Sequence, residues 1–293
     1  MHAVFETGKG ECVFQQVLAI DPKPAGAACA PRAEGSVSVR VRLRAGATRL
    51  ADLRQQGSAK AFFPRHQGPA CEGVLLNTAG GITGGDRFAY RAVAEAGTWL
   101  GLSTQAAERA YRAEPGQTGR LAASLTVAPG ARIDWLPQET ILYDGAALAR
   151  GLEVEMAADS CLLAVEPVIF GRRAMGERVR DLRFSDQWRI RRDGRLIHAD
   201  ALRLFGDADA IMARTAAGAG AGAMASLVLI APDAERFLGP LRALLPETAG
   251  ASVIGPGILA ARMLAVDGRL LRRSLLPMLA CLRGTTLPKV WTL

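Results

Sequence analysis

Short runs of strand-forming residues, divided by turn residues, recur along most of this chain and limit what it can fold into. In residues 36–44 every second position is apolar, from Val37 through Val39 and Val41 to Leu43. Because successive side chains of a strand point to opposite faces, this alternation indicates a strand with one buried face. Further strand-like runs are 73–76, 88–93, 99–103, 121–127, 133–136, 152–156 and 162–165. The succession of strands without intervening helices predicts a mainly β protein without βαβ units.

A hairpin and two late helical segments complete the pattern. Asp193 and Gly194 stand between the strand-like segments 189–192 and 195–198, and both residue types tolerate the positive φ of a type I′ turn. Pro277 is expected to kink or divide the second of the two helices. Their apolar residues recur at helical spacing: Phe237, Leu241, Leu244 and Leu245, then Leu271, Leu275, Met278, Leu279 and Leu282.

The N-terminal region differs from the rest of the chain. Residues 21–35 are rich in Pro, Ala and Gly and offer little to bury. We therefore predict a flexible extension over residues 1–35 and a single β-rich domain over 36–293. The five cysteines include no C-x-x-C pair, which argues against a disulfide framework and a structural zinc site. Neither a secretory signal nor a convincing membrane span is evident, so we predict a cytoplasmic protein without a membrane partner.

The positive charge of the chain leaves one alternative open. A formal net charge of +8 and a pI of about 9.8 allow a polyanion-binding β protein. Arg40, Arg42 and Arg44, however, alternate with apolar residues, which is typical of the solvated face of a strand. Aromatic residues make up only 5% of the chain, too few for the stacking platforms of nucleic-acid proteins. The pattern therefore favours a protein without a nucleic-acid partner.

The common catalytic motifs are absent. The sequence contains no G-x-x-x-x-G-K-[ST], no H-E-x-x-H and no G-x-S-x-G. Its three histidines, His2, His66 and His198, are too few and too scattered for a histidine metal cage. A hydrolase that uses a carboxylate pair such as Asp134 and Glu139 remains the second alternative.

The most unusual stretch is glycine-rich. Residues 80–86 read Gly-Gly-Ile-Thr-Gly-Gly-Asp, but no Lys-Ser/Thr follows, and 87–94 has the character of a strand. Phosphate-binding loops usually open a helix whose N-terminal amides contact the anion. We interpret the stretch as a tight structural crossover, in which glycine permits positive φ and close backbone approach.

Three ordered segments resemble the signature stretches of the UreD family of urease accessory proteins, also called UreH. These are 77–86 (NTAGGITGGD), 103–112 (STQAAERAYR) and 135–146 (WLPQETILYDGA). Residues 171–177 are similar to the family's G-R-x-A-x-G-E element, and 287–291 to its terminal P-R-x-W. The chain departs at 108–110, where the family more often has Thr-Lys-Val. The resemblance spans residues 36–293.

This resemblance implies a β-helix-like stack of short strands with two helices near the C-terminus. It also implies a scaffold that is not an enzyme and holds no tight cofactor. Such proteins assemble with a UreF-type protein and a UreG-type GTPase, bind apo-urease, and promote nickel insertion and carbamylation of the active-site lysine. A passage through the UreD-type protein is thought to carry the nickel.

Nickel in transit needs oxygen ligands at intervals, with too few at any point to trap the ion. Acidic and hydroxyl residues within or beside the signature segments are the candidates. Each could instead pair with a nearby arginine and serve only the fold, because buried carboxylates are costly unless paired. The candidates for the passage are Asp86, Thr104, Glu139, Glu166 and Glu177.

Overall fold

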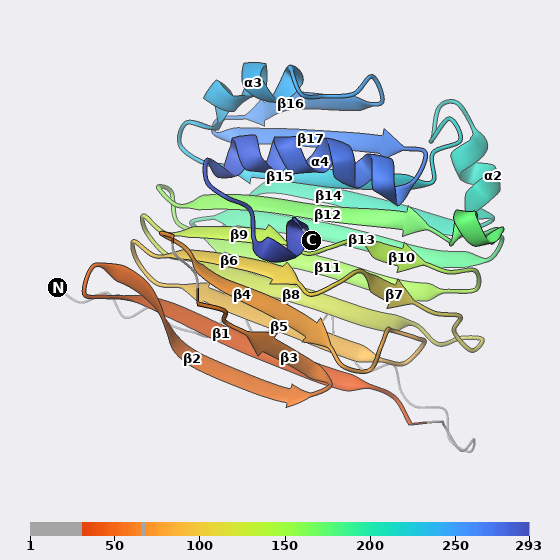
Figure 1. The fold of residues 1–293 in the computed structure, drawn as a ribbon, viewed down its shortest axis with the longest axis horizontal. Helices are drawn as coiled ribbons and strands as arrows, with labels where there is room; N and C mark the ends of the chain where they lie inside the picture. The colour runs from red at the N-terminus through yellow and green to blue at the C-terminus, as the bar shows by residue number, and fades with distance from the viewer. Residues whose placement is uncertain (1–30, 66–67, 293) are drawn as a thin grey trace.

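Two β-sheets packed face to face form the body of the protein. The computed structural model describes residues 31–65 and 68–292 (Figure 1). The seven-stranded sheet has the order β14-β13-β11-β8-β5-β1-β2. Its strands are β1 (Glu34–Arg44), β2 (Ala47–Gly57), β5 (Arg87–Ala94), β8 (Gly119–Val127), β11 (Ala147–Met156), β13 (Leu182–Arg192) and β14 (Arg195–Gly206).

The second sheet has ten strands and the main order β16-β17-β15-β12-β9-β6-β4-β3, with β7 and β10 joined to it beside β12. Its strands are β3 (Ala59–Phe62), β4 (Cys71–Asn77), β6 (Trp99–Thr104), β7 (Glu108–Ala110), β9 (Arg132–Leu136), β10 (Thr140–Leu142), β12 (Cys161–Phe170), β15 (Ala223–Ile230), β16 (Ala249–Gly255) and β17 (Ile258–Ala265).

The chain winds between the two sheets as a coil. From β4 to β13 it passes from one sheet to the other and back, so that strands of successive coils pair in parallel within each sheet. The stacking resembles a β-solenoid of about four turns. Parallel neighbours in one sheet are connected through a strand of the other sheet, where most proteins would have a helix. The predicted β-helix-like fold class is confirmed.

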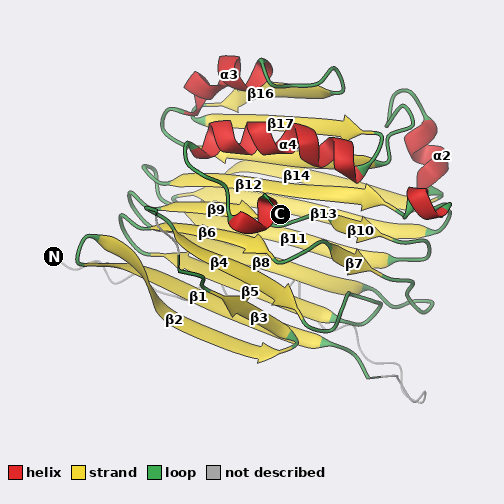
Figure 2. Ribbon diagram, in the orientation of Figure 1, coloured by secondary structure: helices red, strands yellow, loops and turns green. Residues whose placement is uncertain are grey.

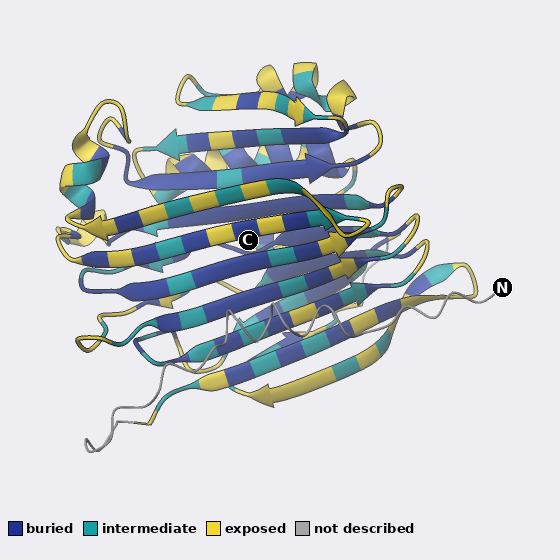
Figure 3. Ribbon diagram, turned by 180° about the vertical axis from the view of Figure 1, so that it is seen from behind, coloured by how far each residue is buried: buried dark blue, intermediate teal, exposed yellow. Residues whose placement is uncertain are grey.

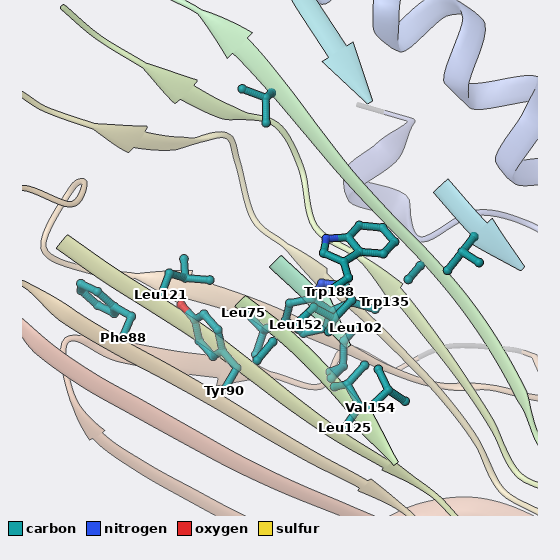
Figure 4. Close-up of a cluster of buried hydrophobic side chains, with 14 of the residues drawn as sticks. Leu75, Phe88, Tyr90, Leu102, Leu121, Leu125, Trp135, Leu152, Val154 and Trp188 are labelled. Carbon is teal, nitrogen blue, oxygen red and sulfur yellow. The ribbon is translucent and has the colours of Figure 1, made fainter. Parts of the chain in front are cut away.

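The inward residues of both sheets form the main core. They follow the alternation expected of strands, and Val37, Val39 and Val41 of β1 are almost fully buried. Larger side chains fill the centre (Figure 4). These include Phe88, Tyr90, Leu121, Trp135, Leu152 and Trp188. Arg40, Arg42 and Arg44 are exposed, as the alternation predicted, but Leu43 near the end of β1 is exposed as well.

A second core lies on the outer face of the ten-stranded sheet, under helices (Figure 2). These are α3 (Leu238–Arg242) and α4 (Gly268–Arg283), and η3 (Lys289–Trp291) follows. The side chain of Asp267 caps α4 by accepting a bond from the Leu270 amide, and Gly284 ends it at φ 70°. Pro277 does not divide α4, because burial of Leu275, Met278 and Leu279 holds both halves against the sheet.

Other local predictions can also be compared with the structure. The 193–194 hairpin is confirmed, with φ of 51° at Asp193 and 77° at Gly194. A short helix, α2 (Ala208–Ala213), was not predicted, and 3₁₀ turns occur at η1 (Arg173–Met175) and η2 (Ala234–Phe237). Strand β1 begins at Glu34, and most of the predicted extension 1–35 lies outside the described residues. Within the part of the chain that is described, no helix combines the length and apolarity needed to cross a membrane.

Candidate functional site

A charged cluster interrupts the apolar interior between the two sheets. Arg150 on β11, Glu166 on β12 and Asp186 on β13 occupy inward positions, because the residues two places away on either side belong to the core. Nη1 of Arg150 lies 2.6 Å from Oε2 of Glu166, and Nη2 lies 2.6 Å from Oδ2 of Asp186. Arg150 and Asp186 are register partners in one sheet, whereas Glu166 comes from the other. One guanidinium therefore joins the two sheets.

Neutral donors and acceptors complete the cluster. Trp135 Nε1 donates to Oε1 of Glu166 at 2.8 Å, and Arg150 Nη1 donates to Oγ1 of Thr140 at 3.0 Å. Oδ1 of Asp186 is buried and receives no hydrogen bond from any described residue. This carboxylate oxygen consequently remains available as an acceptor, at a cost in desolvation.

Burial changes the proton affinity of the cluster. The pKa of Glu166 is raised to about 7: desolvation and the Asp186 charge raise it, and Arg150 and the Trp135 hydrogen bond offset them only in part. Desolvation alone would lower the pKa of Arg150, but Asp186 and Glu166 raise it above its ordinary value. Arg150 is therefore a permanent cation, and Glu166 can change charge near neutral pH.

A second polar group lies beside this cluster. Glu108 on β7 is the register partner of Thr140 on β10. Its Oε2 accepts from Asn77 Nδ2 at 3.1 Å, and its Oε1 accepts from the Arg109 amide at 2.9 Å. Burial raises the pKa of Glu108 and also that of Tyr90, on which the Glu108 charge acts. Polar side chains thus continue from the Arg150 cluster toward the loop after β4.

The outer face of the ten-stranded sheet carries a separate ion-pair group. Asp134 Oδ2 accepts from Trp99 Nε1 at 2.8 Å and from Arg283 Nε at 2.9 Å, and its Oδ1 accepts from Arg132 Nε at 2.7 Å. Arg283 also pairs with Glu72. These contacts fasten the end of α4 to the sheet. They occupy both oxygens of Asp134, so this geometry does not favour a hydrolase that uses Asp134.

Glu139 and Thr104 lie where two neighbouring strands are interrupted. Oε1 of Glu139 is 3.5 Å from Nη1 of Arg272 on α4. Thr104 Oγ1 accepts from the Gln138 amide at 2.9 Å and donates to the Ala106 carbonyl at 3.1 Å. Arg272 also donates to the carbonyls of 290 and 291, so the C-terminal turn covers this position from outside.

Asp86 and Glu177 lie in loops at one end of the coil. Asp86 accepts from the amides of Ala33 and Thr83, both at 2.8 Å. The glycine-rich segment before it is a structural crossover, as predicted: Ile82 pairs with the 108–111 segment, and a Cβ at Gly81 would overlap the Tyr111 ring. Glu177 accepts from Arg172 Nε at 2.9 Å. That hydrogen bond is the largest influence on Glu177 and lowers its pKa, although desolvation acts in the opposite direction.

The five predicted passage residues therefore do not converge on one point. Only Glu166 lies in the Arg150 cluster, and among the described residues no group of three or more His, Cys, Asp or Glu could hold a metal ion. The sequence model of the family described as UreD urease accessory protein matches residues 33–292. This chain belongs to the UreD family. The match covers both sheets, α4 and the C-terminal turn.

Curated UreD relatives align with this chain over nearly their whole length. A urease accessory protein UreD of Ruegeria pomeroyi is 54% identical over 241 residues, which are 82% of this chain and 94% of that protein. The corresponding protein of Roseobacter denitrificans is 47% identical over 263 residues, covering 90% of this chain and 96% of the relative. One from a Ruegeria species is 50% identical over 272 residues, covering 90% and 91%.

Sequence reasoning missed three residues of the interior of this UreD-family protein. Arg150, Asp186 and Glu108 were not candidates, because single charges in strands are usually solvated. A usable signal existed: Arg150 lies midway between Leu148 and Leu152, and so in the inward register of its own strand.

Proposed function

We propose that this chain is a cytoplasmic, non-catalytic scaffold that helps to insert nickel into urease. In this proposal it assembles with a UreF-type protein and a UreG-type GTPase, binds apo-urease, and conducts nickel through its interior. Membership of a urease accessory family supports a role in urease maturation. The GTP chemistry belongs to the partner, which agrees with the lack of a phosphate-binding loop in this sequence.

The observation that carries the proposal is the charged cluster between the two sheets. Glu166, Arg150 and Asp186 are almost fully buried, at side-chain exposures of 4%, 2% and 9%. Burying charges costs free energy even when they are paired, and an apolar replacement of the same volume is often as stable or more stable. Stability alone therefore does not explain a charge cluster at the centre of a core, and we propose that the cluster serves transport.

We propose a route for nickel that passes the five candidate residues in turn. Asp86 and Glu177 stand at the end of the coil where the β5 and β13 strands begin. Glu166 lies further inside. Strands β6 and β9 stop at Thr104 and Leu136 and resume as β7 and β10, which interrupts two adjacent strands at one level. Thr104 and Glu139 flank this interruption, and we propose that nickel passes between the interior and the outer face here.

The charge balance suits transit better than storage. With both carboxylates ionised, Arg150 reduces the charge of the cluster to −1, and with Glu166 protonated the charge is zero. A divalent cation is then attracted weakly, as a conducting site requires. Oδ1 of Asp186, which has no donor among the described residues, is the acceptor that we propose for the ion.

The test is the substitution Glu166→Gln, which keeps the volume and removes the charge. Asp186 still pairs with Arg150 in this variant, so we expect the chain to fold and assemble but to activate urease poorly. The complex should be pulled down, and urease activity and nickel content measured in the same samples. Glu247→Gln, at an exposed position, is the matched control. Normal assembly with wild-type activation would remove Glu166 from the passage, and lost assembly would leave it a structural role alone.

A further inference from the structure

The end of the chain covers the outer side of the interruption between β9 and β10. This C-terminal turn, residues 287–291, lies with α4 on the ten-stranded sheet (Figure 2), away from the seven-stranded sheet that stands in front in Figure 3. Trp291 is fully buried, and its Nε1 donates to the carbonyl of Leu136, the last residue of β9, at 2.9 Å. Gln138 Nε2 donates to the Val290 carbonyl at 2.5 Å. The turn is therefore fixed to the sheet at the point where β9 stops.

The C-terminal turn also holds the guanidinium of Arg272 on α4. Nη2 of this arginine donates to the carbonyls of Val290 at 3.1 Å and of Trp291 at 2.9 Å. Nη1 donates to Oε1 of Gln138 at 2.5 Å. The guanidinium carbon lies 5.0 Å from the centre of the Trp291 ring, within reach of a cation–π interaction. All of these partners are neutral, so they fix the position of the cation without cancelling its charge.

The carboxylate of Glu139 receives a weak contact from Arg272. Its Oε1 is 3.5 Å from Nη1, which is longer than the roughly 2.7–3.2 Å of an ordinary N–H···O bond. Among the described residues this is the only hydrogen bond or ion pair of that side chain, although Glu139 is just 7% exposed. A buried carboxylate is costly unless it is paired. Glu139 therefore has unused capacity to bind a cation.

The turn and Glu139 compete for the same donors of Arg272. A guanidinium binds a carboxylate most strongly through two parallel hydrogen bonds, and in either arrangement Nη2 is one of the two donors, together with Nη1 or Nε. The two hydrogen bonds to the turn use the hydrogens of Nη2. While the turn is in place, Arg272 cannot form a two-bond pair with Glu139. Without the turn, the freed Nη2 could move to the carboxylate, because an ionised acceptor binds a donor more strongly than a carbonyl does.

We propose that the C-terminal turn is a positioning element, which holds Arg272 away from Glu139 and so keeps that carboxylate available to a divalent cation. Arg272 stays close enough to weaken the attraction, as a site that must release its ion requires. The identification of the cation as nickel in transit rests on the proposed function. The competition between the turn and the carboxylate for Arg272 does not.

The first test removes the turn and then the arginine that it holds. A chain lacking residues 288–293 is co-expressed with the UreF-type protein, the UreG-type GTPase and apo-urease. We expect the complex to assemble but urease activation to fall about tenfold, because Arg272 now pairs with Glu139. Adding Arg272→Gln should restore activation to within about twofold of the wild type. The control Arg273→Gln, at an exposed position on the same helix, should not restore it.

The second test keeps the turn, so it does not depend on the folding of a shortened chain. In the full chain, Arg272→Lys retains the charge but loses the planar fork that fits the two carbonyls, so its compact ammonium can move onto Glu139. Arg272→Gln removes the charge. We expect urease activation to be about threefold lower with Arg272→Lys than with Arg272→Gln. If Arg272 served only packing or charge balance, the conservative Arg272→Lys would activate better than Arg272→Gln.

A structure of the shortened chain in its complex tests the contact without nickel. Two N–O distances between Arg272 and Glu139 below about 3.2 Å are expected. A contact that stays at 3.5 Å, unchanged activation by the shortened chain, a loss that Arg272→Gln does not restore, or Arg272→Lys more active than Arg272→Gln would each overturn the proposal. If the wild-type chain delivers no nickel to urease, the proposed function fails, and the distances in the shortened chain still decide whether the turn positions Arg272.

Discussion

Arg150 and Glu166 form an ion pair of 2.6 Å that crosses from one sheet to the other inside the coil. Arg150 pairs with two buried carboxylates, Glu166 and Asp186. Its loss would leave both acids unpaired in a medium of low polarity. The stability of the coil and the charge of the proposed passage therefore depend on the same residue.

Replacing Arg150 with methionine should destabilise the fold strongly. Removing one partner of a buried ion pair costs about 3–5 kcal/mol, because the remaining charge is buried without compensation. Urea denaturation should show this loss in the free energy of unfolding of Arg150→Met. Adding Glu166→Gln and Asp186→Asn should recover part of it. A single variant as stable as the wild type would show that the carboxylates are solvated rather than dependent on Arg150.

The stability difference between wild type and Glu166→Gln should depend on pH. Burial raises the pKa of Glu166 from an ordinary 4.5 to about 7, so the folded state binds the proton more tightly than the unfolded state. The contribution of Glu166 to stability is then greatest below pH 4.5 and declines as the pH rises to about 7. The variant lacks this titrating group, so its free energy of unfolding should rise relative to that of the wild type between pH 4.5 and about 7. Urea unfolding of both proteins at half-unit pH steps measures this difference in stability. Stability curves that stay parallel over the whole pH range would contradict the raised pKa of Glu166.

Gly101 should tolerate no side chain. A Cβ at this position would overlap Oε2 of Glu72 and lie 3.2 Å from Nη2 of Arg283, which is the contact that holds the end of α4. We expect Gly101→Ala to lower the free energy of unfolding by about 1–3 kcal/mol. Gly250→Ala, on strand β16 with open space around it, is the control. Similar melting temperatures for the two variants would show that the Glu72 and Arg283 pair can move aside.

The isolated chain should bind neither GTP nor ATP. The 80–85 glycine segment leads into strand β5 rather than a helix. Three of its amides, those of Ile82, Thr83 and Gly85, already donate to acceptors within the protein and so do not surround a phosphate. Titration calorimetry should give no saturable heat. A micromolar signal that persists after every trace of GTPase is removed would contradict this.

Features that depend on neighbouring residues could be predicted from the sequence. The alternation in β1 and the Asp193-Gly194 hairpin are set within a few residues, because side-chain alternation and turn dihedrals are local properties. The glycine-rich crossover was predicted as a structural element for the same reason. The ordered signature segments also predicted the family and its β-helix-like fold.

The interior cluster was decided by the tertiary structure. Arg150 is 36 residues from Asp186 in the sequence and meets it only because β11 and β13 pair in parallel at that register. Glu166 joins them because β12 lies in the opposite sheet with the same inward alternation. Local patterns show which residues share a face of one strand. The winding of the coil determines which faces meet, since pairing between distant strands depends on the combined packing of all the turns.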